Sequence, residues 1–131
     1  MNIEKIFKNL IILYIVFFIS LMFIVGYIDW HIPVDSDAEI GVIDGIFIIF
    51  AIIYFINLYF LYKFKPIGKT LFIPVFFLVG FFDFFVSYES FFLTPGYEHI
   101  GRLLTGIDYM LIGMIIALLY FTDIKEKFKK T

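Results

Sequence analysis

The chain has 131 residues and a formal net charge of −2 at neutral pH, and 63% of its residues are hydrophobic and 23% aromatic. A soluble domain of this size has too much surface for its volume to hide so many apolar side chains, which excludes a water-soluble globule as the expected fold. The absence of cysteine excludes disulfides, cysteine-ligated zinc, iron–sulfur clusters and thiol catalysis. The composition predicts a protein that lies in a lipid bilayer.

The first apolar segment is uncharged from Leu10 to Ile28, close to the ~20 residues that cross a bilayer as a helix. It is longer than the apolar region of a signal peptide, and it is followed by Asp29, Trp30 and His31, where a cleavage site would need small residues. The segment is therefore predicted to stay in the mature protein as an uncleaved signal anchor.

Three further apolar segments follow, and each of them contains an aspartate. All are much longer than the ~10 residues of a membrane-spanning β-strand and lack the alternation of a barrel. Residues 1–131 are therefore predicted to form a single all-α membrane domain. Its four transmembrane helices, arranged as an up-down bundle, are expected at about residues 10–28, 40–62, 70–90 and 103–122.

Basic residues are distributed unevenly along this topology. Nine of the ten precede the first segment, separate the second from the third, or follow the fourth. By the positive-inside rule that side is cytoplasmic, so both termini are expected in the cytoplasm. The expected location is the cell membrane, as a multi-pass protein, and the residue choice favours a bacterial inner membrane. The bilayer itself, a second copy of the chain or another membrane protein are the expected partners, and nucleic acid is not one.

An internal resemblance links residues 25–30, VGYIDW, with residues 79–84, VGFFDF. Each motif precedes an acidic connection and then another segment with an early aspartate. This pattern predicts two pseudo-symmetric helical hairpins related by a two-fold axis along the membrane normal.

Four aspartates that interrupt or border the apolar segments define the candidate site: Asp29, Asp44, Asp83 and Asp108. A charged aspartate at the centre of a membrane helix costs ~2.5 to 3.5 kcal/mol, so it normally faces the bundle interior or water. Asp44, Asp83 and Asp108 fall at about one level in the outer third, with Asp29 at the mouth. A polar pocket between the third and fourth helices is predicted to contain Asp83 and Asp108, whereas Asp29 and Asp44 are equally explained as hydrated residues near the interface. Arg102 is expected to pair with Glu98 or Asp108, and substrate binding is the less favoured alternative.

Two histidines, His31 and His99, are predicted in opposite outer loops beside acidic residues, which makes them weak candidates for a divalent-metal site. Their spacing matches no defined metal motif, so surface histidines are the simpler interpretation, and no cofactor is predicted.

Several residues are expected to serve helix packing and anchoring. Close helix contacts are predicted at small residues, namely Gly41, Gly45, Gly106, Gly113 and Ala117. Asn57 is expected to hydrogen-bond across helices or to reach the interface. Aromatic anchors at the cytoplasmic boundary are predicted at Tyr59, Tyr62 and Tyr120.

Three functions fit this pattern. The first is a binding or transport module in which a carboxylate-lined pocket in the outer half takes up a cation, a proton or a small polar ligand from the outer face. The second is a structural or accessory membrane subunit whose polar residues hold helices or a partner. The third is a membrane-embedded enzyme that uses Asp83, Asp108 and the histidines, but the sequence carries no nucleotide-binding, Rossmann, Ser-His-Asp or metalloprotease signature. The first hypothesis is favoured.

Overall fold

A computed structural model describes residues 2–31, 42–86, 96 and 98–129 of the chain. These residues form four α-helices and one short 3₁₀-helix, and no strand occurs among them. In chain order they are α1 (Ile3–His31), α2 (Val42–Tyr62), α3 (Pro66–Val86), α4 (Glu98–Phe121) and η1 (Asp123–Phe128). The predicted all-helical architecture is confirmed.

Three helices, α1, α3 and α4, begin earlier than the apolar segments that predicted them. The side-chain oxygen of Asn2 accepts hydrogen bonds from the backbone N–H groups of Glu4 at 3.1 Å and Lys5 at 3.3 Å, so α1 starts at a capped, polar turn. Helix α3 starts at Pro66, whose fixed φ and missing N–H suit a first helical position. Hydropathy marks the part of a helix that avoids water, whereas capping residues mark where the helix begins.

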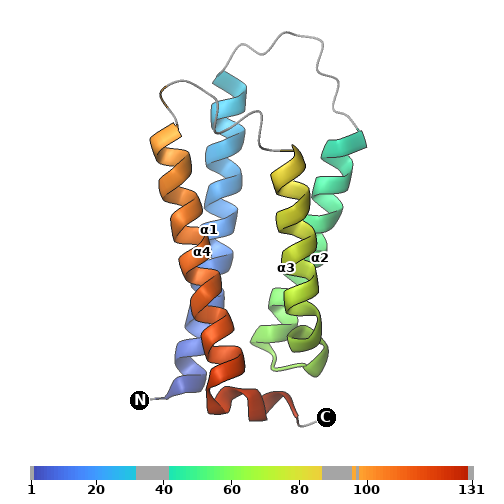
Figure 1. Cartoon of the computed structure of the whole chain (residues 1–131), viewed down its shortest axis with the longest axis vertical. Coiled ribbons are helices and arrows are strands. Elements are labelled where there is room, and N and C mark those ends of the chain that lie inside the picture. The colour runs from blue at the N-terminus through green and yellow to red at the C-terminus, as the bar shows by residue number, and fades with distance from the viewer. Residues whose placement is uncertain (1, 32–41, 87–95, 97, 130–131) are drawn as a thin grey trace.

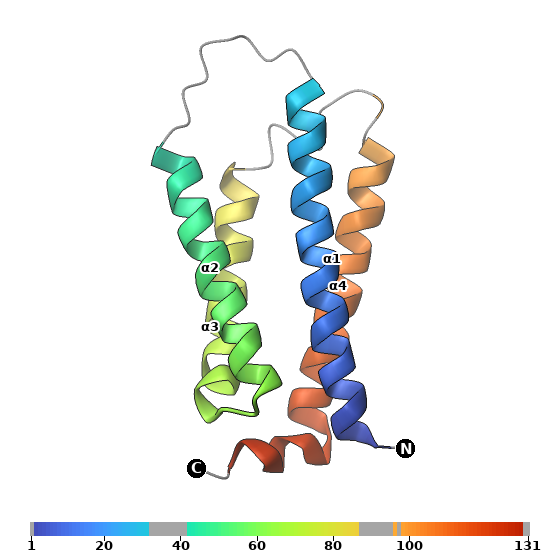
Figure 2. The same ribbon diagram turned by 180° about the vertical axis from the view of Figure 1, so that it is seen from behind.

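The helices pack as two neighbouring pairs, α1 beside α4 and α2 beside α3 (Figures 1 and 2). The N-terminus, the C-terminus and the connection between α2 and α3 all lie at the same end of the bundle (Figure 1). This end, formed by residues 2–8, 60–68 and 120–129, is called the inner end below, and the opposite one the outer end. The predicted two-fold axis would map the α2–α3 pair onto the α4–α1 pair. The arrangement of the helices does not test this symmetry, which stays a prediction.

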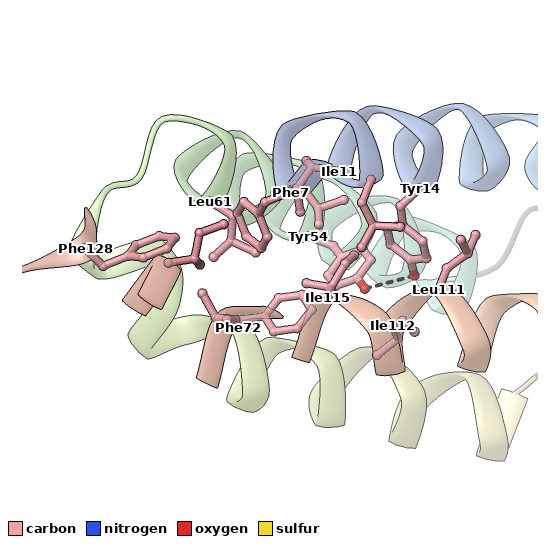
Figure 3. Packing of buried hydrophobic residues seen from close by; sticks show 14 residues of the cluster. Phe7, Ile11, Tyr14, Tyr54, Leu61, Phe72, Leu111, Ile112, Ile115 and Phe128 are labelled. Carbon is pink, nitrogen blue, oxygen red and sulfur yellow. Dashed lines mark hydrogen bonds between the residues drawn. The ribbon is translucent and has the colours of Figure 1, made fainter. Parts of the chain in front are cut away.

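The buried core lies in the inner half of the bundle and draws on all four helices and η1 (Figure 3). Its fully buried members include Phe7 and Ile11 from α1, Leu58 and Leu61 from α2, and Ile115 from α4. Dispersion contacts in this cluster hold the pairs together at the inner end, since polar contacts between helices are few among the described residues.

The connection between α2 and α3 is a tight turn at Phe64, whose φ of 54° lies in the left-handed region. That conformation costs a non-glycine residue about 1 to 2 kcal/mol. Packing offsets this cost, because the Phe64 ring stacks on Phe7 at 5.8 Å and meets Phe128 edge-on at 5.3 Å. Immediately after the turn, Gly68 lies against the backbone of α2, where an added Cβ would come within 2.8 Å of Phe60 and Leu61.

The 3₁₀-helix η1 covers the inner end of the bundle (Figure 2). Its two apolar residues, Ile124 and Phe128, are buried. An ion pair of 3.3 Å between Lys127 and Glu4 joins η1 to α1. Helix η1 is therefore a cap whose apolar side faces the core and whose lysines face outward.

Two stretches of the described residues, Ile3–Ile24 and His99–Phe121, are helical, long and apolar enough to cross a membrane. The described apolar parts of the other two helices, Ile48–Tyr62 and Pro66–Gly80, are shorter.

The predicted packing role of the glycines is wrong within this chain for Gly45, Gly106 and Gly113, because a Cβ built on any of them meets nothing within 4 Å. Ala117 is likewise exposed, and Gly41 lies outside the described residues. Gly68 is a described glycine at which two helices come together, and it follows a tight turn rather than belonging to a small-residue repeat.

Candidate functional site

Two tyrosines meet in the middle of the bundle. Tyr14 of α1 and Tyr54 of α2 are each 1% exposed, and the Tyr54 hydroxyl donates a hydrogen bond of 2.9 Å to the Tyr14 hydroxyl (Figure 3). Their rings meet edge-on with centroids 6.0 Å apart, and Phe18 packs against both. The pair is a polar contact between α1 and α2 with an aromatic wall around it.

Asp108 of α4 completes this group. Its carboxylate lies near the Tyr14 hydroxyl, and its negative charge acts on both tyrosines. The side chain is half-buried, and it lies one turn before Leu111 and Ile112, which are 4% and 3% exposed. The helical period therefore turns Asp108 toward the core, on the side where Tyr54 donates its hydrogen bond to Tyr14.

The three residues occupy the level at which the buried core ends. Counting 1.5 Å per residue, Asp108 lies about 15 Å from the outer start of α4, and Tyr14 lies about 16 Å from the inner start of α1. The carboxylate is thus closer to mid-helix than the outer-third level inferred from sequence. Among described side chains of α1 and α4, every buried apolar one lies on the inner side of this level or at it.

The other predicted site residues are placed less fully. Asp29, Asp44 and Asp83 belong to α1, α2 and α3, toward the outer ends of those helices, but their side chains lie outside the described part of the structure. The polar pocket predicted to contain Asp83 and Asp108 therefore stays a prediction. The described interactions of Asp108 lead to α1 and α2. Arg102 is exposed on α4.

The histidines and the expected polar stripe are also placed in part. His99 is exposed at the start of α4, and the side chain of His31 lies outside the described residues. Among the described residues, no three histidine, cysteine or acidic side chains are grouped so that they could hold a metal ion. Thr105, expected to share a polar stripe with Asp108, donates its hydroxyl to the Gly101 carbonyl at 2.9 Å within its own helix.

A second polar group lies deeper in the core. Asn57 of α2 is 2% exposed and follows Tyr54 by three residues, so both project from similar faces of the helix. Neither its amide nitrogen nor its amide oxygen bonds to any described residue. The predicted hydrogen bond across helices is therefore not made within the described part of the chain. Leaving such a group unsatisfied costs about 1 to 3 kcal/mol.

Sequence reasoning missed Tyr14 and Tyr54 as site residues. The available signal was depth, since both tyrosines fall well inside an apolar segment rather than at its boundary, where tyrosine usually anchors a helix. A buried tyrosine hydroxyl needs a hydrogen-bond partner, and at this depth only another polar side chain can supply it.

The donor set consists of one carboxylate and two phenolic hydroxyls, all of them hard oxygen atoms. Such a set suits a proton or a small hard cation, whereas soft or borderline metals favour sulfur and imidazole. Comparison with protein-family models, curated proteins and solved structures gives no match to this chain.

Proposed function

We propose that the chain is an integral membrane protein whose four helices all cross the bilayer with both termini in the cytoplasm. In support, α2 and α3 each have 21 residues, about 31 Å of helix, which matches a hydrocarbon thickness of ~30 Å. Every described lysine lies at or next to the inner end, whereas His99 and Arg102 belong to the outer start of α4. The inner end is then the cytoplasmic one.

Within this membrane protein, the group formed by Asp108, Tyr14 and Tyr54 binds one positive charge, a proton or a monovalent cation of the size of Na⁺. A carboxylate at this depth is costly to keep charged unless a positive charge accompanies it. One carboxylate balances one such charge, and the tyrosine oxygens are further ligands or proton donors. The observation that carries this proposal is the contact of Asp108 with a tyrosine pair that is itself 1% exposed.

The outer side is the proposed route of entry. Asp29, Asp44 and Asp83 lie in the helical segments toward that end, and negative charges near a binding site raise the local concentration of cations. The site would then take up a cation from outside and, if it opens toward the inner side, transport it.

Infrared difference spectroscopy of the purified full-length chain in lipid tests cation binding. Replacing choline by Na⁺, or changing the pH, is expected to alter a carboxyl band that Asp108→Asn removes. Asp123→Asn, which removes an exposed carboxylate from η1, is the matched control and is expected to leave that band unchanged. The proposal would be refuted if the Asp108→Asn spectrum kept every carboxyl band that responds to Na⁺ or pH in the wild type.

A gentler variant guards against misfolding of Asp108→Asn. Tyr14→Phe keeps the ring and the carboxylate but removes the hydroxyl that lies near the carboxylate, so the apparent affinity for Na⁺ or a proton is expected to change by about tenfold. Sodium-driven or pH-driven flux in proteoliposomes, read by an internal dye, then distinguishes transport from binding alone.

The structural role is the second candidate, and one observation favours it: the hydrogen bond between Tyr54 and Tyr14 joins α1 to α2 in the core. If this role is the correct one, Tyr14→Phe and Asp108→Asn will lower thermal stability, and Asp108→Asn will remove no carboxyl band that responds to Na⁺ or pH.

A further inference from the structure

One exposed face of α2 changes in chemistry along its length. Ile52, Ile56, Tyr59 and Lys63 follow one another at successive turns, and the first three are 53%, 49% and 55% exposed. Over about 16 Å the face passes from aliphatic side chains through a phenol to an ammonium group. In the proposed topology this sequence runs from the hydrocarbon toward the cytoplasmic headgroups.

A second lysine reaches the same place from another helix. The Nζ atom of Lys63 lies 5.8 Å from the Tyr59 ring centre and 5.9 Å from that of Tyr62, and the Nζ atom of Lys8, on α1, lies 5.6 Å from the Tyr62 ring. Two ammonium groups, one from α1 and one from the residue that follows α2, therefore share one tyrosine ring. Lys8 also pairs with Glu4 at 3.3 Å, whereas no described carboxylate pairs with Lys63.

The tyrosine hydroxyls at this place are available to a ligand. Within the described residues, neither Tyr59 nor Tyr62 uses its hydroxyl in a hydrogen bond to the protein. Tyr120 offers a contrast, because its hydroxyl donates to the Lys69 carbonyl at 3.0 Å while the Lys69 ammonium lies 5.4 Å from its ring centre. All three tyrosine rings lie near a lysine ammonium group. Tyr120 uses its hydroxyl in a hydrogen bond to the protein, whereas Tyr59 and Tyr62 do not do so within the described residues.

We propose that this place, formed by Lys8, Tyr59, Tyr62 and Lys63, binds the headgroup of an anionic phospholipid of the cytoplasmic leaflet. The ammonium groups and phenolic hydroxyls supply charge-assisted hydrogen bonds to its phosphate, and the aliphatic face beyond Tyr59 contacts its acyl chains. The aliphatic side chains of α2 would lie beside the acyl chains of the phospholipid, and the phenols and ammonium groups would lie beside its phosphate. The inference rests on the proposed membrane topology and is independent of the Asp108 site.

The occupant is anionic because the site is cationic. Zwitterionic lipids carry their own ammonium group, which the two lysines would repel, whereas each lysine near an anionic surface adds to the attraction. A bound headgroup would bridge α1 and α2 at the inner end, so it is expected to raise the thermal stability of the protein.

The test uses the full-length protein in a neutral detergent, titrated with short-chain phosphatidylglycerol or phosphatidylcholine while bound lipid is counted by native mass spectrometry. The wild-type chain is expected to retain phosphatidylglycerol about tenfold more tightly than phosphatidylcholine. In the double variant Lys8→Gln with Lys63→Gln this preference is expected to fall about tenfold.

The matched control removes two charges elsewhere at the inner end. Lys65→Gln with Lys125→Gln alters exposed lysines that lie near no described tyrosine ring, and it is expected to change the preference less than twofold. Should the control pair weaken phosphatidylglycerol binding as much as the Lys8 and Lys63 pair, the attraction is diffuse and the proposed site is wrong.

Two further arms keep the result interpretable. Tyr59→Phe with Tyr62→Phe preserves packing and charge, and it is expected to weaken phosphatidylglycerol binding about threefold. Inorganic phosphate at millimolar concentration is expected to displace little lipid, and full displacement would overturn the lipid assignment in favour of a soluble phosphate.

Asp108→Asn is expected to bind phosphatidylglycerol as the wild type does, so failure of the cation site and failure of the lipid site are distinguishable.

Discussion

The inner and outer halves of the bundle differ in how their helices meet. In the inner half, α2 and α3 approach closely at Gly68, and η1 covers the core with two buried apolar side chains. In the outer half, Gly45, Gly80 and Gly106 have nothing within 4 Å of an added Cβ. The close approach of α2 to α3 and the buried core thus both lie in the inner half of the described structure, whereas these three glycines of the outer half lie on open helix faces.

The candidate site lies where these two halves join. Tyr14 and Tyr54 belong to the buried core, whereas Asp108 is half-buried at its outer limit. A binding site needs a rigid scaffold to hold its ligands and a side that a ligand can reach. If the proposed cation site is correct, the inner half would supply the scaffold and the outer half the access.

The largest expected effect is a cavity in the inner half. Ile115→Ala removes a side chain that is 0% exposed, and it is expected to lower the free energy of unfolding by about 2 to 4 kcal/mol. Met114→Ala alters the neighbouring residue, which is 40% exposed, and is expected to change it by less than about 1 kcal/mol. Denaturant unfolding of both variants in the same detergent measures the difference. Equal losses would show that the inner core is not the source of stability.

Hydropathy predicted the helical class of this protein because long apolar segments without alternation have no other structure in a membrane. It could not predict the neighbours of Asp108. The position of a residue along a helix gives its depth, but which other helix it faces depends on packing. Tyr14 is one of nine tyrosines in a chain rich in aromatic residues, so its identity alone carried no signal.

The glycines also show that helix packing could not be predicted from the sequence pattern. A small-residue repeat in the sequence predicted close contacts at Gly106 and Gly113, but the described structure makes its close contact at Gly68. What distinguishes Gly68 is its place directly after a tight turn, which brings α3 back against α2 within one helical turn. Such a contact depends on the turn geometry at Phe64 rather than on a repeat.

Two glycine-to-alanine substitutions compare a position where the backbones of two helices are in contact with a position on an open helix face. Gly68→Ala places a Cβ within 2.8 Å of backbone atoms of Phe60 and Leu61 that cannot move independently of α2, so it is expected to destabilise the protein by about 1 to 3 kcal/mol. Gly106→Ala, in the outer half of α4, meets open space in a helix interior and is expected to be neutral or to stabilise by up to about 1 kcal/mol. Thermal unfolding followed by circular dichroism gives both values. The comparison fails if the two variants are equally destabilised.

The polar exception in the inner core gives a smaller effect. Asn57→Leu replaces a buried amide, unpaired among described residues, by an apolar side chain of similar size, and it is expected to raise stability by about 1 kcal/mol. Asn9→Leu, at an exposed position of α1, is the control and is expected to change stability very little. A loss of stability in Asn57→Leu but not in Asn9→Leu would contradict the prediction, and it would mean that the amide has a partner beyond the described residues.

The smallest effect is expected at the charged surface of the inner end, because η1 is held there by Ile124 and Phe128 rather than by its ion pairs. Glu126 forms an exposed ion pair of 2.9 Å with Lys129, and this hydrogen-bonded lysine lowers the pKa of the Glu126 carboxyl below its ordinary value. A carboxyl with a lowered folded-state pKa stabilises the fold above its unfolded-state pKa, and this contribution is lost as the pH falls through the folded-state value. Lys129→Gln is therefore expected to return the pKa of Glu126 toward the ordinary range in an NMR titration, while the midpoint of thermal unfolding at neutral pH stays nearly unchanged because the pair is exposed. If Lys129→Gln lowered that midpoint as much as Ile115→Ala does, charge rather than apolar packing would hold the inner half together.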